Sequence, residues 1–455
     1  MSTKENIRTN PENISQYVIE TVLLQSDRLE QPFELNRITT DIEIYESMTR
    51  PFLTGKIAIV ENSNLLNNID FLGGEKLTIS IKSLEAETHG SAPIPITKTF
   101  YIDEIIFNQK GGDHTEVIAF HLVEDIEFEC NLQNINKFFN GNVSRTMKKI
   151  ANQYLNKNIN TSLGSVNSSI SVIVPNMHPL ESLTWLTKSI SSQDGYPYYL
   201  FSSFVSDELI LADLGSLIES PSVNKDGPYR NWQAATLSDD PNVNSRTMIA
   251  YNVEKSDNLY NLINHGFIGA NYSYIDTLTN KTNNFDFNII EDLIKPISKT
   301  LLPKEQRNAT ISPLYKNSID DKPFQESISV AKTFIGGSNA FKNTTSDFDL
   351  SYSENSSLAD YKQGTVANAL YALLQKSPLT VTVNGTPFLK GDMHYTIGRN
   401  VTLHFLTSIT DKSTDEEKLD IKKSGDYLIY AAKHSFKREK YDLQITGVKL
   451  ANMDR

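Results

Sequence analysis

Two stretches of the chain, one near each end, carry the same order of predicted β-strands. Residues 74–81 (GEKLTISI) and 398–405 (GRNVTLHF) each begin with a glycine and two polar residues and continue as an alternating strand. Downstream of each, two further strands are joined by a short polar hairpin, over residues 100–122 and 427–449. Chance can produce such patterns among β proteins, but matching order and spacing favour duplication. The repeated positions are Gly74, Thr78, Gly398 and Thr402.

Between the two repeats, residues 176–214 have the pattern of one helix followed by a β-hairpin. Pro179 suits a first helical turn, and apolar residues then recur at helical spacing, at Leu180, Leu183, Leu186 and Ile190. Gly195 and Pro197 are expected to end the helix. Two apolar strands follow, split by a turn-prone serine–aspartate pair. The pattern predicts a small packed unit and, by itself, no chemistry.

The order of residues in this segment resembles the hub proteins of contractile injection machines. That family includes the central baseplate hub of T-even-like phages and the hub portion of type VI secretion spike proteins. The residues that carry the resemblance are Leu183, Trp185, Leu186, Gly195, Tyr198, Tyr199, Phe201, Leu211 and Asp213. The resemblance is close over this segment and extends at lower resolution over most of the chain. In that family the segment is structural, so no catalytic residue is implied here.

The resemblance also gives the repeat a meaning. In the hub family, paired tube-like domains let a trimer present six nearly equivalent positions, which joins a hexameric tail tube to a trimeric spike. It therefore implies a homotrimer with a spike protein below, a tail tube or tube-initiator protein above, and baseplate wedge proteins around it. DNA would pass through the lumen without specific binding, and no cofactor is implied. The chain ends at Arg455 without the needle of type VI spike proteins, which favours the separate phage-type hub.

The predicted fold class is β-rich α+β, with two tube-like antiparallel β-barrel domains and mixed helix and β-hairpin insertions. Helices are expected at residues 142–155 and 360–375, where apolar residues align on one side. The expected divisions are a flexible arm (1–14), a first tube-like β domain (15–125), a mixed helix and β-hairpin domain (126–220), a connecting loop (221–244), a second tube-like β domain (245–290 with 376–452) and an insertion ending in a helix (291–375).

Charge and cysteine content exclude several classes of function. The formal net charge of −12 argues against a protein that binds nucleic acid by neutralising phosphates. On net charge alone, an acidic lumen would repel the DNA backbone and let it slide. The single cysteine, Cys130, excludes an internal disulfide and a multi-thiolate metal site, and a buried, inert thiol is expected. No apolar run is long enough to predict a transmembrane helix.

The sequence offers no recognisable catalytic motif. None of the eight histidines has partners at zinc-site spacing, and His178 is expected to hydrogen-bond to the backbone. No glycine pair precedes a helix that could hold a phosphate, and no G-x-S-x-G motif is present. Asp103 and Glu104 are adjacent on a predicted strand, so they are expected to face opposite ways rather than act as a glycosidase pair.

The sequence therefore predicts a structural, non-enzymatic hub subunit of a virion tail baseplate, assembled in a bacterial host cytoplasm. Two alternatives stay open. The first is a β-rich carbohydrate-binding or adhesin-like tail protein, which the 20 tyrosines and 21 phenylalanines would suit, although aromatic residues also fill β cores. The second is a tail-associated cell-wall hydrolase. The sequence also leaves open whether the particle is a phage or a phage-derived injection particle.

Overall fold

The computed structural model describes residues 17–62, 69, 71, 73–83, 95–112, 115–162, 169–188, 190, 192, 196–224, 227–231, 246–253, 259–276, 281–294, 318–319, 322–323, 330–336, 358–374, 378–389, 396–406, 419–420, 423–437 and 440–448. Within these residues, no helix is both long and apolar enough to span a membrane. The expected arm at residues 1–14 lies outside them.

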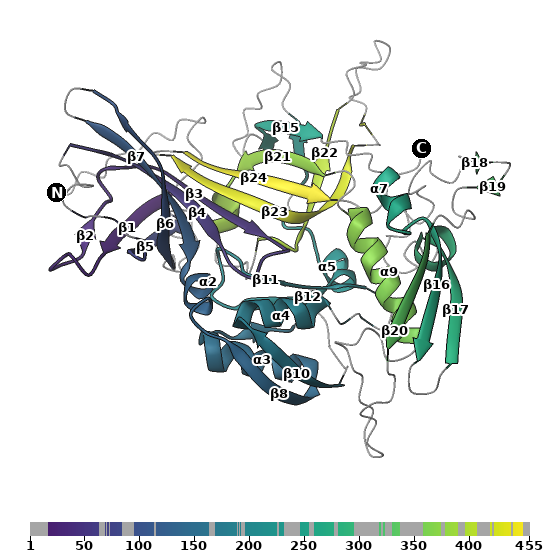
Figure 1. Ribbon diagram of the computed structural model, residues 1–455. Helices are drawn as coiled ribbons and strands as arrows, with labels where there is room; N and C mark the ends of the chain where they lie inside the picture. Colours follow the sequence, from purple (N-terminus) through teal and green to yellow (C-terminus); the bar gives the residue numbers. More distant parts are fainter. Residues whose placement is uncertain are drawn as a thin grey trace, which may run out of the picture.

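A large mixed sheet of fourteen strands dominates the fold (Figure 1). Its strands are β1 (Tyr17–Gln25), β2 (Phe33–Glu34), β3 (Thr39–Ser47), β4 (Thr54–Glu61), β5 (Lys76–Ser83), β6 (Ile96–Lys110), β7 (Glu116–Glu124), β13 (Tyr229–Asn231), β14 (Thr247–Met248), β15 (Ala250–Val253), β21 (Leu379–Asn384), β22 (Asn400–His404), β23 (Gly425–Lys437) and β24 (Lys440–Val448). The protein is thus β-rich, as expected. Over the described residues the pairings leave the sheet open and close no barrel.

Two groups of five strands within this sheet have the same order. We call β3–β4–β7–β6–β5, hydrogen-bonded in that order, the first strand unit. We call β15–β21–β24–β23–β22 the second strand unit. Every pairing within each unit is antiparallel. The sequence repeat aligns β5 with β22, β6 with β23 and β7 with β24, so equivalent strands hold equivalent places.

The two units also agree in register. Leu77 of β5 lies opposite Phe100 of β6, and Val401 of β22 lies opposite Tyr427 of β23. These are the residues that the sequence alignment makes equivalent. The next pairs along the strands place the two repeated threonines opposite Thr99 and Asp426, respectively. Matching register means that equivalent side chains point to equivalent faces, because a shift of one residue would turn every side chain over.

The repeated glycines share a backbone arrangement as well. The amide of Gly74 donates to the carbonyl of Ile102 at 3.3 Å, and the amide of Gly398 donates to the carbonyl of Ile429 at 2.8 Å. Both glycines have a positive φ, +98° and +77°, which glycine adopts without steric cost. A β-bulge then follows immediately after Ile102 in β6 and immediately after Ile429 in β23. Bulges re-aim a strand, so both long strands turn at the same point.

The middle of the chain forms a mixed helical and β region below the large sheet in Figure 1. It contains α2 (Asp125–Cys130), α3 (Val143–Leu155), α4 (Pro179–Lys188), α5 (Leu214–Glu219) and the short strands β8 (Ile135–Asn142), β9 (Ile159–Asn160), β10 (Ser169–Met177), β11 (Tyr198–Phe201) and β12 (Leu209–Asp213). The expected helix at 142–155 is confirmed as α3. Asn142 caps it by accepting a hydrogen bond from the amide of Arg145 at 3.1 Å.

The hairpin of β11 and β12 is buried along its whole length because it is covered on both faces. Tyr198 and Leu211 belong to an apolar cluster with α3 and α4. Tyr199 and Phe201 belong to a second cluster with the second strand unit. A strand covered on both faces needs a continuous apolar run, which explains why this segment does not alternate.

The remaining elements, except for one 3₁₀ turn that contacts β5, lie beyond the second strand unit in Figure 1. They are α7 (Leu259–Asn264), β16 (Gly269–Asp276), β17 (Lys281–Asn288), a π-helix (Ile289–Ile294), β18 (Ser318–Ile319), β19 (Lys322–Pro323), β20 (Val330–Gly336), α9 (Leu358–Leu374) and a 3₁₀ turn (Thr386–Leu389). The helix expected at 360–375 is confirmed as α9.

Two pairings differ from the divisions expected from the sequence. β16 and β17 form a separate three-stranded sheet with β20, rather than joining the second strand unit. β13 lies in the segment expected to be a connecting loop, and it pairs in parallel with β22 and β14. The domain boundaries given above remain predictions.

Candidate functional site

The candidate site is the junction where the two strand units meet. Seven residue pairs join β3 to the C-terminal half of β23 in antiparallel register, from Ser47 opposite Ala431 to Asp41 opposite Lys437. The eight strands β15–β21–β24–β23–β3–β4–β7–β6 therefore form one continuous antiparallel run. The chain places its two strand units side by side in tandem, edge to edge.

A polar cluster lies buried beneath this junction. Oε1 of Glu46 in β3 lies 3.0 Å from Nε2 of His434 in β23, and Nδ1 of His434 lies 2.7 Å from the hydroxyl of Tyr441 in β24. The imidazole of His434 therefore lies between the carboxylate of Glu46 in the first strand unit and the hydroxyl of Tyr441 in the second. Burial, reinforced by the charge of Glu46, raises the pKa of Tyr441 well above its ordinary value. The phenol therefore stays protonated.

The other oxygen of Glu46 holds the segment that follows β11. Oε2 accepts from the hydroxyl of Ser203 at 3.0 Å and from the amide of Phe204 at 2.8 Å. The hydroxyl oxygen of Ser203 accepts in turn from the amide of Thr396 at 3.1 Å. The Phe204 ring lies 4.9 Å from the His434 ring between centroids. One carboxylate thus joins both strand units and the mixed region.

Serine, histidine and glutamate together raise the question of a hydrolase. Ser203 donates to Glu46, whereas a nucleophilic serine must donate to the histidine that takes its proton. Ser203 and His434 are both fully buried, so no substrate reaches them. The cluster is therefore structural. We call Glu46, His434, Tyr441 and Ser203 the lock, because their contacts hold the two strand units and the mixed region together. Over the described residues, no group of three potential metal ligands is present either.

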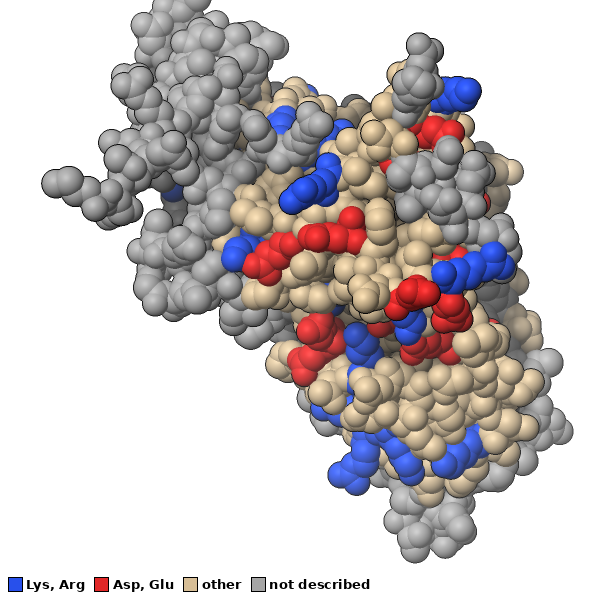
Figure 2. Space-filling view, turned by 90° about the vertical axis from the view of Figure 1, so that its left-hand side faces the viewer, with Lys and Arg blue, Asp and Glu red and all other residues tan. Residues whose placement is uncertain are grey.

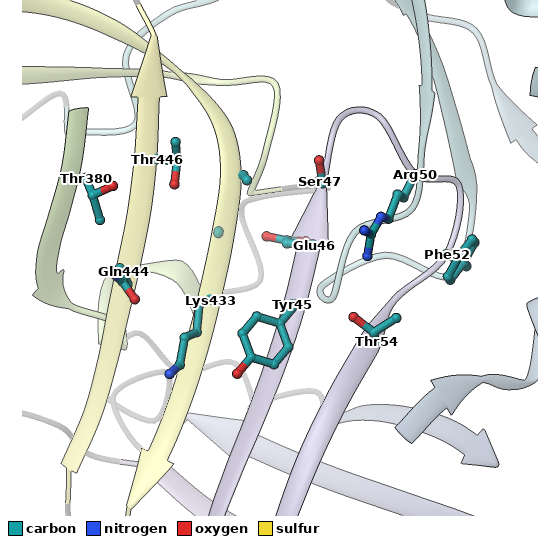
Figure 3. Close-up of a pocket in the computed structure, with 12 residues that line it drawn as sticks. Tyr45, Glu46, Ser47, Arg50, Phe52, Thr54, Thr380, Lys433, Gln444 and Thr446 are labelled. Atoms are coloured by element: carbon teal, nitrogen blue, oxygen red, sulfur yellow. The ribbon is translucent and has the colours of Figure 1, made fainter. Parts of the chain in front are cut away.

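On the opposite face of the junction, the strands border a hollow of about 310 Å³ (Figure 3). Tyr45 and Lys433 lie side by side there, with the ammonium 5.6 Å from the ring centroid. Lys433 Nζ also lies 2.6 Å from a carboxylate oxygen of Glu43. Burial disfavours the charge on Glu43, but hydrogen bonds from Lys433 and Tyr45 outweigh it and hold the pKa of that carboxyl below its ordinary value. The remaining labelled residues of the lining are three threonines (Thr54, Thr380 and Thr446), Ser47, Gln444, Arg50, Phe52 and Glu46 of the buried cluster.

Along each strand, buried side chains alternate with side chains that point to this side of the sheet. We call this side of the junction the open face. On β3, β4, β24 and the part of β23 paired with β3, its charged residues are Asp41, Glu43, Asp442, Lys56, Lys433, Lys437 and Lys440. Six of these seven form ion pairs, at 2.6 Å (Lys433–Glu43), 2.9 Å (Lys440–Asp442) and 3.8 Å (Lys437–Asp41). The open face at the junction is thus charge-paired, although the whole chain carries a net charge of −12.

The residues of the helix–hairpin motif are packing residues in the structure. Leu183 and Leu186 of α4 are buried in the cluster that contains Tyr198 and Leu211, and Trp185 packs against it. The helix ends at Lys188, before the expected stop at Gly195, which lies outside the described residues. Asp213 caps α5 by accepting from the amide of Ser216 at 3.0 Å. Tyr199 stacks on Tyr371 of α9, with ring centroids 4.9 Å apart.

The structure brings one motif residue and one repeat residue together. A Cβ built on Gly398 would lie 2.9 Å from the ring of Phe201. At the other repeated glycine, Gly74, the nearest atom is 3.9 Å away, on Phe128. The helix–hairpin unit therefore docks directly on the second strand unit at its repeated glycine, a contact that the sequence did not indicate.

Two smaller expectations are confirmed. His178 Nδ1 lies 2.8 Å from the backbone carbonyl of Gln133. Cys130 is buried and accepts a hydrogen bond from the amide of Leu180 at 3.1 Å. Burial raises the pKa of the Cys130 thiol to about 11, so it is protonated and unreactive at neutral pH.

The lock at the junction was missed by sequence reasoning, although a signal existed. In β3 the core positions are Ile42, Ile44 and then Glu46. A carboxylate in an apolar series on an alternating strand indicates a buried partner, because an unpaired buried charge is costly.

No protein-family model matches the chain, and no curated protein sequence matches it. Among solved structures, it is similar to the tail protein from Neisseria meningitidis MC58, with 13% identity and a TM-score of 0.49, over 95% of this chain and 96% of that one. It is similar to the 43 kDa tail protein of prophage MuSo2 from Shewanella oneidensis, with 13% identity and a TM-score of 0.48, over 96% of this chain and 99% of that one.

A third likeness is to a chain in the lidded PdpA–VgrG complex of Francisella, with 10% identity and a TM-score of 0.45, over 97% of this chain and 54% of that one. The first two of these structures are tail proteins.

Proposed function

We propose that this chain is a structural hub subunit of a tail baseplate. Three copies form a ring of six nearly equivalent strand units, which joins a sixfold tail tube to a threefold spike. The observation that carries the proposal is the tandem of two units with the same strand order, register, glycine contacts and bulges. A subunit that contains its own pseudo-equivalent pair satisfies both symmetries without changing its fold.

In this proposal the strand units curve together into tube-like walls, and the open face lines the lumen. Six of the seven charges of that face are paired at the junction, and only Lys56 has no ion pair with a described residue there. The wall therefore offers neither an acidic field nor a concentration of cations that would hold a phosphate backbone. This replaces the acidic lumen expected from net charge alone. DNA would pass through without specific binding because no concentrated positive surface retains it.

The partners follow from the ring. One rim would accept the tail tube or a tube-initiator protein, the other would grip the spike, and wedge proteins of the baseplate would pack outside. The protein would then reside in the virion tail after assembly in the host cytoplasm. The proposed role is mechanical, and no residue is assigned a catalytic role.

The test is the native mass of the purified protein by light scattering, alone and after co-expression with the spike gene of the same particle. Three chains of 51.2 kDa give about 154 kDa. A discrete species of that mass, or a complex of three chains with three spike chains, is expected, and electron microscopy should show a ring with a pore. A monomer in both preparations would overturn the proposal.

A further inference from the structure

The junction inside the chain is formed by β3 and β23. By the repeat, two other strands are equivalent to these, and over the described residues the two equivalents do not pair with each other. Within the chain, the edge of β23 in the second strand unit pairs with β3 of the first strand unit. By the repeat, β6 is the counterpart of β23, and β15 is the counterpart of β3. Over the described residues, β15 pairs only with β21, and the outer half of β6 pairs only with β7.

The free half of β6 is exposed where its counterpart is buried. β5 pairs with β6 only as far as Tyr101, so residues 104–110 have one open edge over the described chain. Ile105 and Ile106 are 40% and 43% exposed there. In the part of β23 that pairs with β3, by contrast, the side chains of Ala432 and Phe436 are buried. An exposed apolar edge strand is a template for another strand.

The free edge of β15 also carries exposed apolar side chains. Tyr251 of β15 is 45% exposed, whereas its equivalent in β3, Ile42, is fully buried. Neighbouring Ile249 is exposed as well. In Figure 1, β6 and β7 reach one end of the molecule, whereas β15 lies beyond β21 on the other side of the strand run. Two complementary free edges on different sides suit head-to-tail association of copies.

We propose that β15 of one copy adds to the free edge of β6 of a second copy, in antiparallel register, and so repeats the β3–β23 joint between chains. This inference rests on the proposed function and specifies its interface. Three joints inside chains would then alternate with three joints between chains around the ring. Figure 2, which faces the side where β6 and β7 lie in Figure 1, shows acidic and basic residues interspersed there. Strand pairing and apolar contact, rather than a field of one sign, would hold the copies together.

The register between copies follows from the ladders within each unit. Gln109 lies opposite Val117 of β7, as Ser435 lies opposite Asp442 of β24, so Gln109 is equivalent to Ser435. This count includes the second bulge of β6, which falls after Ile105.

In the same way, Asn252 is equivalent to Glu43, because their partners Thr380 and Lys56 occupy equivalent places in β21 and β4. Ser435 lies opposite Glu43 inside the chain. The expected contact therefore places Gln109 of one copy opposite Asn252 of the next.

Paired cysteines test this register. In antiparallel strands, directly opposite residues have Cβ atoms about 4.5–5.5 Å apart, whereas residues two positions away are about 7–8 Å apart. The full chain carrying Gln109→Cys and Asn252→Cys should form covalent dimers and then a covalent trimer under mild oxidation, and no larger species. Both positions are exposed, so folding should persist, and native Cys130 is buried.

Two controls are matched to this variant. Each single substitution should give at most covalent dimers in trace amounts. The pair Gln109→Cys with Ala250→Cys, which is two residues out of register, should cross-link at least tenfold less.

The outcomes separate this inference from the proposed function. A trimer by mass that does not cross-link at the matched pair, or cross-links equally at the shifted pair, overturns the interface and leaves the ring intact. A monomer with and without the spike overturns both. A covalent ladder that continues beyond three copies shows the joint without ring closure, and contradicts the trimer.

Discussion

Glu46 and His434 lie 3.0 Å apart between Oε1 and Nε2, with neither side chain exposed, although 388 residues separate them in the chain. They come from different strand units, so this contact fixes how the units lie against each other. The same network includes the hydroxyls of Tyr441 and Ser203 and the amide of Phe204. Satisfied networks of this kind stiffen a core, and partly broken ones are costly.

Removing Glu46 should therefore destabilise the fold strongly. Glu46→Ala leaves His434, Ser203 and an amide without their buried acceptor. Because each unsatisfied buried group costs about 1–3 kcal/mol, we expect a total loss of about 3–5 kcal/mol in the free energy of unfolding. Chemical denaturation at one fixed protein concentration measures it. The matched control is Lys440→Ala, which removes an ion pair to Asp442 from a half-exposed lysine and should cost less than about 1 kcal/mol. Equal losses in the two variants would show that the buried network does not hold the units together.

The two repeated glycines give a comparison within one molecule. Gly74→Ala and Gly398→Ala both force a side chain into left-handed backbone, at a cost of about 1–2 kcal/mol each. Gly398→Ala should cost a further 1–3 kcal/mol or so, because its Cβ would meet the buried ring of Phe201. Thermal and denaturant unfolding of the two variants check the order. A larger loss at Gly74 would contradict the docking of the hairpin on the second strand unit.

Glu124 should make stability depend on pH. Burial raises the pKa of this carboxyl, which accepts from the amide of Leu53 at 2.7 Å. A folded pKa above the unfolded one means that its contribution is fully present below the unfolded pKa and is lost as pH rises through the folded pKa. Glu124→Gln keeps an acceptor without the charge. The variant should gain stability relative to the unsubstituted protein as pH rises above the ordinary pKa of 4.5 for this carboxyl. A difference that stays constant with pH would exclude this carboxyl as the cause.

Asp213 tests one residue of the helix–hairpin motif as a packing and capping residue. It accepts from the amide and the hydroxyl of Ser216 at the start of α5. Asp213→Ala should cost about 1 kcal/mol, and Asp213→Asn, which can still cap, only a few tenths. Neither variant should change the native mass of the protein. A change in mass with unchanged unfolding would instead place Asp213 at an interface.

The sequence predicted most of the strands, because alternation with one buried face is a local signal. β4 illustrates this, since Ile57 and Ile59 are buried while Lys56 and Ala58 face outward. It also predicted the equivalence of β5 with β22 and of β6 with β23. It could not predict that β23 would take β3 as a third neighbour, because edge pairing between distant strands depends on the shape of both units and leaves no local trace. For the same reason, the parallel pairing of β20 with β16 was missed.

The lock beneath the junction has a mechanical consequence for the proposed ring. Inside each chain, the joint between units is clamped by Glu46 and His434, and a long covalent chain ties its two sides. At the joint proposed between chains, the place of His434 is taken by exposed Asn108, so that joint lacks the clamp. The ring would then consist of three stiff arcs linked by three compliant hinges. Any misfit between a threefold spike and a sixfold tube would be absorbed at the hinges, while the curvature of each arc stays as the folded chain set it.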